Sequence, residues 1–390
     1  MQRLIRLFSP RDGFSMIVGL LLLIGILLIS MAVPRLSDAG SPQQAAIAVL
    51  SSTVSANNPA DVMGWQACVK CHKLEVQAWM KTKHYKSLQI LDPANANVQK
   101  YCKALGITPA DVQKGGLCIT CHATAQTNPA GITRAISGVS CESCHGASGG
   151  KDGWLNRHAV YGPNGTKPAM ETPKHRATRI ELCEKSGMIR APRIARLAQN
   201  CFGCHLIGNE KLIAAGHKAG STGFELVGWT SGEVRHNFHA EVQTPQTSNA
   251  EAPRLWMRNT GGTAAQRKRI KFVVGALTDL EASLRQRAAA KSPAIIAQLG
   301  GRIGGLNGKL AQIAGAAPTA NQIPPLQGKI GAAFARLFAP MPGDQKYYTG
   351  IADAVAAAAK QFLKAHTGSK LAGLDGLLKA TPPKGTVFQP

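Results

Sequence analysis

CVKCH, residues 68–72, is the first of four copies of the pentapeptide pattern that decides the fold. The others are CITCH at 118–122, CESCH at 141–145 and CFGCH at 201–205. C-x-x-C-H is the attachment signature of c-type haem, in which two thiols bond to one haem and the adjacent His binds its iron. Eight of the ten Cys belong to these copies, so the sequence predicts four covalently bound haems c.

Each copy supplies two thiols for attachment and one proximal iron ligand. The thiols are Cys68, Cys71, Cys118, Cys121, Cys141, Cys144, Cys201 and Cys204. The proximal ligands are His72, His122, His145 and His205. Zinc and thiol-redox sites also use C-x-x-C, but neither requires a His directly after the second Cys. We therefore favour haem over zinc or a disulfide framework.

The composition is strongly basic. Lys and Arg number 45 against 21 Asp and Glu, a formal net charge of +24 over 390 residues. The propionates of four haems offset up to about 8 of these charges, so the loaded protein stays basic. Such a surface favours acidic redox partners or anionic lipid headgroups, and it equally fits a diffuse, solvated charge. Nothing in the sequence indicates a nucleic-acid partner, and nothing favours a particular oligomeric state.

The N-terminus predicts a membrane anchor. Residues 1–13 form a basic stub, and Phe14–Val33 is a run of 20 residues without charge, long enough to cross a bilayer as a helix. The positive flank predicts a cytoplasmic N-terminus, a single pass through the inner membrane, and a periplasmic location for the bulk of the chain. A signal peptide cleaved near residues 37–39 is the alternative, but the apolar cores of signal peptides are shorter.

The haem motifs define the central domain. Residues 34–60 are rich in Ala, Ser, Pro and Asn, which predicts a linker. Residues 61–250 hold all four motifs and ten of the eleven His, and Pro and Gly interrupt every long helical pattern. We expect the haems to replace the missing apolar core, so that the tetrahaem cytochrome c domain unfolds without them.

The remaining chain predicts a second, helical unit. Residues 251–390 contain no Cys and only His366, and we predict a helical C-terminal subdomain there. The predicted helices are Lys268–Lys291, Ala294–Ala314, Tyr348–His366 and Lys370–Ala380. The expected fold class is therefore mostly α with much irregular structure, a multihaem core, an N-terminal transmembrane helix and this subdomain.

Seven His lie outside the motifs, and this surplus suggests bis-His coordination of iron. His84, His158 and His217 are the preferred distal ligands. His84 follows His72 after a helical stretch and cannot swing back onto its own haem, so we expect it to bind a neighbouring iron. His236 and His239 compete for one further site.

Other ligand candidates rank lower. They are His175, His366, Met80, Met170 and Met188. Two Cys also remain outside the motifs. Cys102 and Cys183 form either a disulfide, which an exported chain permits, or two buried free thiols.

The motifs and their flanks resemble the cytochrome c-554 family of multihaem electron carriers. The resemblance covers roughly residues 64–240 and is most specific around the third motif. It rests on CVKCH at 68–72 with WMKTKH at 79–84, on GVSCESCHG at 138–146, and on LIAAGH at 212–217 with FEL at 224–226.

The resemblance implies a mostly helical structure around closely packed haems, with electron transfer as the function. It implies that His84 and His158 are distal ligands, and it suggests that the second haem, on Cys118 and Cys121, lacks a protein sixth ligand. The long Cys-free C-terminus and the predicted anchor differ from the soluble carriers of that family.

The leading interpretation is a membrane-anchored, periplasmic tetrahaem cytochrome c that transfers electrons between a membrane or enzyme donor and a redox partner. An alternative is a haem enzyme with one open iron that acts on nitric oxide, hydroxylamine or nitrite, although no separate acid–base group supports it. Two further hypotheses are a quinol dehydrogenase with a haem near the membrane, and a subunit of a respiratory assembly that docks through the C-terminal helices.

Overall fold

The structure, a computed structural model, describes residues 58–218, 220, 223–236, 261–337, 341 and 343–389. The predicted anchor at 14–33, most of the predicted linker and His239 lie outside these residues. Within the described ranges, no helix combines the length and apolar character that crossing a membrane requires.

The region that contains the haem motifs is built from short helices. They are α3 (Gln66–Val69), α4 (Lys73–Met80), α5 (Lys83–Lys86), α6 (Ala96–Leu105), α7 (Leu117–His122), α8 (Cys141–His145), α9 (Leu155–His158), α10 (Pro173–Lys185), α11 (Ile194–His205), α12 (Glu210–Ala214) and α13 (Leu226–Ser231). The second, third and fourth motifs end α7, α8 and α11, so each proximal His is the last residue of its helix. The first motif spans α3 and the turn before α4.

Polar caps fix where these helices begin. The side chain of Thr82 accepts a hydrogen bond from the Tyr85 backbone at the start of α5, and Asn209 does the same for Leu212 at the start of α12. Such caps satisfy backbone N–H groups that a helix start leaves without partners. They place His84 and His217 at defined positions only a few residues after the caps.

A two-stranded hairpin between the second and third motifs was not predicted from the sequence. It consists of β1 (Thr124–Thr127) and β2 (Thr133–Ser137), which pair antiparallel. The Asn128 side chain accepts hydrogen bonds from the Ala130 and Ile132 backbones, which closes the turn. The hairpin returns the chain, so that the two motifs lie close together.

The predicted C-terminal helices are confirmed, with shifted ends. They are α15 (Ala264–Ala289), α16 (Pro293–Ala316), α18 (Asp344–Ala365), and a 3-10 turn (Ser369–Leu374) that leads into α19 (Asp375–Lys379). A further helix, α17 (Pro324–Arg336), was not predicted. Helix α16 tolerates its glycines because its other face buries Leu299, Ile303 and Leu310.

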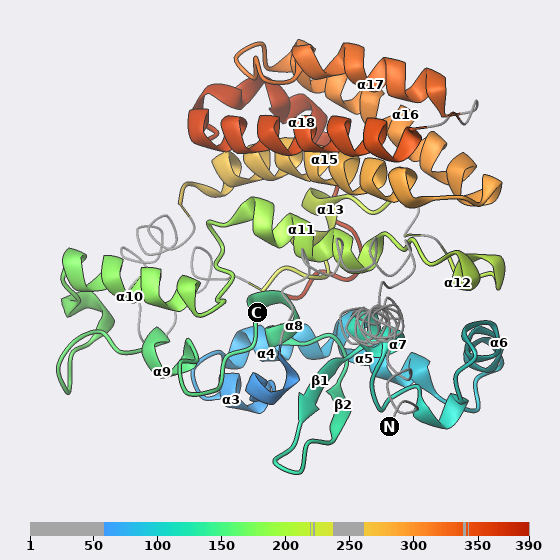
Figure 1. The fold of residues 1–390 in the computed structure, drawn as a ribbon. Coiled ribbons are helices and arrows are strands. Elements are labelled where there is room, and N and C mark those ends of the chain that lie inside the picture. Colours follow the sequence, from blue (N-terminus) through green and yellow to red (C-terminus); the bar gives the residue numbers. More distant parts are fainter. Residues whose placement is uncertain are drawn as a thin grey trace, which may run out of the picture. The chain divides into compact units, whose positions relative to one another are not determined.

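The C-terminal helices share one apolar core with the fourth motif. Helix α15 packs against α18 on one side and α11 on the other, as Figure 1 shows. Leu277, Leu280 and Leu284 of α15 are fully buried, and Phe202 of the fourth motif belongs to the same cluster. Burial of apolar side chains in this shared core stabilises both the fourth-motif region and the C-terminal helices, at roughly 25 cal/mol for each Å² of apolar surface removed from water.

The last residues return to the haem region. The Lys384 backbone N–H donates to the Gly228 carbonyl, and the Lys384 carbonyl accepts from the Glu233 N–H. Further on, Phe388 packs against Ala78 of α4. The C-terminal tail therefore ties α13 and the segment after it to the first haem motif region.

Candidate haem sites

Each of the four motif His rings faces a second His ring. The centroid separations are 6.1 Å for His72 and His158, 6.2 Å for His122 and His217, 5.9 Å for His145 and His236, and 5.9 Å for His205 and His84. In every pair the second His comes from a distant part of the sequence. His84 thus pairs with the fourth motif and not with its own, as expected from the helical stretch before it.

This spacing fits one iron ion between each pair. Imidazole nitrogens bind first-row metal ions at about 2 Å, so two rings on opposite sides of one ion have centroids about 6 Å apart. The four separations, 5.9–6.2 Å, match the spacing expected for two His ligands on opposite sides of one haem iron.

Backbone carbonyls orient three of the rings. Nδ1 of His145 lies 2.8 Å from the Ile189 carbonyl, Nδ1 of His217 lies 2.9 Å from Lys218 and Nδ1 of His236 lies 2.8 Å from Val234. A hydrogen bond at Nδ1 fixes the proton there and leaves Nε2 available for a metal. The donor set therefore fits a haem iron in its chemistry as well as its spacing.

Burial keeps the rings neutral, which is the form that binds iron. Burial, together with smaller contributions from neighbouring His and Arg side chains, lowers the pKa of His145, His158 and His205 to about 4. The pKa values of His84 and His122 are also lowered, mainly by burial. All five rings are deprotonated near neutral pH.

A buried ion pair supports His158. Arg179 donates to Glu171 through two nitrogens, both at 2.6 Å, and donates through a third to the His158 carbonyl at 2.7 Å. The Arg179 guanidinium also lies 4.9 Å from the Tyr161 ring centroid. This network fixes the end of α9 and therefore the direction of the His158 side chain.

Lower-ranked candidates have other partners. His175 pairs with Glu171 at 2.9 Å, and the His366 ring packs on Phe362. Met170 is 67% exposed. Sequence reasoning left His236 undecided against His239, because the two lie three residues apart in similar surroundings. The number of motifs was the one available signal, because four haems with two His ligands each require a fourth distal His.

The thiols of different motifs adjoin one another. The Cys68 and Cys141 thiols lie close enough to interact, which raises the pKa of Cys68 and lowers that of Cys141. The thiols of Cys204 and Cys121 interact in the same way, which raises the pKa of Cys204 and lowers that of Cys121. Cys144, which is half-buried, lies close enough to Cys201 for their charges to interact, and its pKa is raised to about 12, mainly by desolvation.

The two remaining Cys are separate free thiols. Cys102 is buried in a small cluster with Val98 and Val112. Cys183 is buried against the Trp154 carbonyl, 3.8 Å from its Sγ. Of the two possibilities open from the sequence, the structure shows buried free thiols and not a disulfide.

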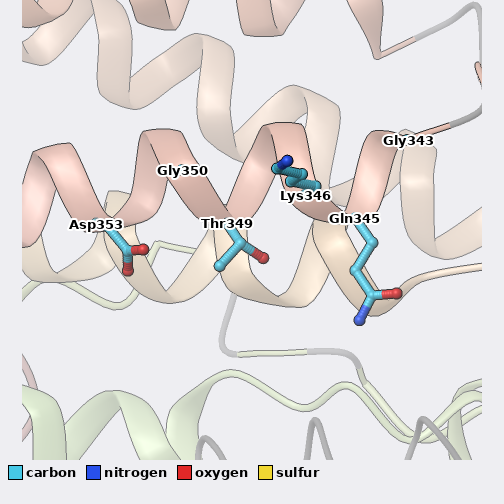
Figure 2. Close-up of a pocket in the computed structure, with 6 residues that line it drawn as sticks. All are labelled: Gly343, Gln345, Lys346, Thr349, Gly350 and Asp353. Carbon is cyan, nitrogen blue, oxygen red and sulfur yellow. The ribbon is translucent and has the colours of Figure 1, made fainter.

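A surface hollow lies away from this chemistry. It follows the start of α18, and its walls come from that helix and the residue before it (Figure 2). The lining residues are Gly343, Gln345, Lys346, Thr349, Gly350 and Asp353. None is a His or Cys, so this hollow has no part in holding a haem.

Gly138 allows the chain before the third motif to approach His84. A Cβ atom at this position would lie 2.2 Å from the His84 carbonyl oxygen and 2.5 Å from that of Tyr85. Gly138→Ala is therefore expected to separate these segments and to lower the free energy of unfolding by about 1–3 kcal/mol. Urea unfolding of the haem-loaded protein measures this change.

Gly301→Ala is the matched control. Gly301 lies on the exposed side of α16, and an added Cβ meets nothing within 4 Å. Ala is the better helix former, so this variant is expected to gain up to about 1 kcal/mol. Equal stability of the two variants would show that the approach of Gly138 to His84 is unimportant.

Comparisons with known proteins match part of the chain to cytochromes. The family model "Cytochrome c554 and c-prime" matches residues 67–146, which include the first three motifs. Cytochrome c-554 of Nitrosomonas europaea is 30% identical over 169 residues, which are 42% of this chain and 65% of that relative. This chain thus spans just under two thirds of the relative's length. No solved structure matches the chain.

Proposed function

We propose that the chain is a tetrahaem c-type cytochrome that carries electrons, and its match to the cytochrome c-554 family model over residues 67–146 supports this. The observation that carries the proposal is the set of four His pairs, each with centroids 5.9–6.2 Å apart. Every pair contains the His of one C-x-x-C-H motif. Haem supplies a one-electron iron couple when bound, and the axial ligands and surroundings set its potential.

The chain's own residues perform three tasks in this proposal. The eight motif thiols hold the haems covalently, and the His pairs bind iron from both faces. His84, His158 and His217 are the distal ligands expected from the sequence, and His236 is added as the fourth. Two neutral nitrogen ligands per iron favour fast electron exchange, because both oxidation states keep the same ligands.

The thiol contacts give the sites an order. Cys68 adjoins Cys141, Cys144 is near Cys201, and Cys204 adjoins Cys121. Since each thiol holds the edge of its own haem, these contacts connect the first motif to the third, the third to the fourth, and the fourth to the second. Electrons would follow that order or its reverse.

The ends of this order reach the surface. Cys71 of the first motif is exposed. At the other end, His217 is only half-buried, and the exposed Lys100 and Lys218 lie beside it. With a formal net charge of +24, the chain would dock acidic redox partners. Phe14–Val33 supports anchoring in the inner membrane with the haem region in the periplasm.

The geometry favours a carrier over an enzyme with an open iron. The family resemblance suggested an open position at the second motif, yet His217 lies 6.2 Å from His122 with Nε2 available. A distal ligand at this iron leaves no coordination position for a small substrate in the resting protein.

Mass spectrometry and electron paramagnetic resonance of the purified, mature protein test the proposal together. The expected mass exceeds that of the polypeptide by four haems, and the oxidised spectrum contains only low-spin iron. A colourless protein, or a mass with fewer haems, would exclude the tetrahaem cytochrome. A high-spin signal from one iron would restore the enzyme hypothesis for the second motif.

A further inference from the structure

A buried carboxylate connects the first and third motifs. Glu142 is the second residue of CESCH, and it is only 1% exposed. It accepts hydrogen bonds from the backbone N–H groups of Met63 at 3.0 Å and Gly64 at 2.7 Å, which belong to the loop before the first motif. It also accepts from the Ser148 N–H at 2.8 Å and the Ser148 hydroxyl at 2.7 Å.

These four partners all donate, so the Glu142 carboxyl acts as an acceptor at both oxygens. This is the role of a carboxylate and not of a neutral acid, which must itself donate one proton. Backbone N–H groups at 2.7–3.0 Å replace the water that burial removes. The arrangement holds a negative charge inside the protein.

The charge of Glu142 acts on both motifs. The pKa of Cys68 is raised by its hydrogen bond with Cys141, by burial, and by the charges of Cys141 and Glu142. Glu142 likewise acts to raise the pKa of Cys141, against the larger effect of the bond from Cys68. Two thiols of two different motifs therefore lie within the field of one carboxylate.

We propose that Glu142 is a built-in negative charge shared by the haem sites of the first and third motifs, and that it lowers the reduction potentials of both. This role rests on the proposed function, because it requires haems at these motifs. The oxidised iron carries one more positive charge than the reduced iron, so a nearby anion stabilises the oxidised form. Burial weakens solvent screening and so extends the effect.

Glu142→Gln in the full, haem-loaded chain tests the proposal by optical redox titration. The variant removes the charge and keeps the size of the side chain. Two of the four potentials are expected to rise, with at least a tenfold change in the reduced-to-oxidised ratio at fixed potential, about 59 mV for one electron. The other two haems are expected to change by less than about threefold. Glu181→Gln, on the exposed side of α10, is the control and should shift none.

Ser148→Ala separates the effect of charge from loss of structure. It removes the hydroxyl donor, so the negative charge of the carboxylate is less well neutralised and the same two reduction potentials should fall. The expected size is about a two- to threefold decrease in the reduced-to-oxidised ratio at fixed potential. A merely structural role predicts that both variants shift the potentials in the same direction. If Glu142→Gln fails to mature, the sign of the shift in Ser148→Ala decides, and a rise or no change overturns the proposal.

The readouts also separate this inference from the proposed function. Fewer than four haems in the unaltered protein would remove the tetrahaem cytochrome itself. Four low-spin haems whose potentials ignore Glu142→Gln would leave the carrier intact and overturn the role of Glu142. Haem count by mass is therefore measured on every variant before its titration.

Discussion

Replacing His84 with Ala is expected to open one iron in every molecule while all four haems stay attached. His84 faces His205 at 5.9 Å, and its ring is buried and neutral. Because the thiols of the fourth motif are untouched, the mass should still show four haems. About a quarter of the iron should become high-spin, and the reduced variant should bind one carbon monoxide per chain.

His175→Ala is the control for this variant. His175 also follows a capped helix start in the haem region, but it pairs with Glu171 at 2.9 Å and its side chain is 39% exposed. Its removal should leave every iron low-spin and bind no carbon monoxide. Identical spectra for the two variants would contradict the assignment of His84 as a distal ligand.

Phe202→Ala is expected to destabilise the protein by about 3–5 kcal/mol, the usual effect of removing a fully buried aromatic ring. Phe202 is the second residue of CFGCH and is 1% exposed in the core shared with α15. Its ring meets Phe224 edge-on at 5.2 Å, and Phe224 stacks on His205 at 4.3 Å. The cavity would therefore loosen the proximal ligand of the fourth motif as well as the core.

Guanidinium unfolding followed by circular dichroism measures the loss, and the visible spectrum reports the ligation of the fourth iron. Phe334→Ala is the control, because that ring is 37% exposed on α17. The control should lose less than about 1.5 kcal/mol and keep its haem spectrum unchanged. A loss in Phe202→Ala no larger than in the control would mean that α11 and the C-terminal helices are not joined as one core.

Predictions of local chemistry need no knowledge of the fold. The C-x-x-C-H pattern is contiguous, so the thiols and proximal His of each site can be predicted from the sequence alone. Helical patterns in the sequence predicted α15, α16 and α18, with apolar residues at helical spacing for α15 and an Ala-rich composition for α18. The pairing of His217 with His122 could not be derived, because it depends on how segments 95 positions apart in number meet in space.

The missed elements have physical reasons. The hairpin lies between the second and third motifs, with turn-forming residues at Asn128 and Gly131. Its strands are too short to show a clear alternation of apolar and polar residues. Helix α17 begins with Pro324 and Pro325, and Pro is well tolerated in the first turn of a helix. The pairing of His236 with His145 could not be derived either, because it depends on how distant segments meet in space.

The C-terminal tail has a consequence for biosynthesis. Lys384 and Phe388 are synthesised after all four pentapeptides, and they close over α13 and α4. A haem attached while the chain emerges would therefore meet α13 and α4 before these residues cover them.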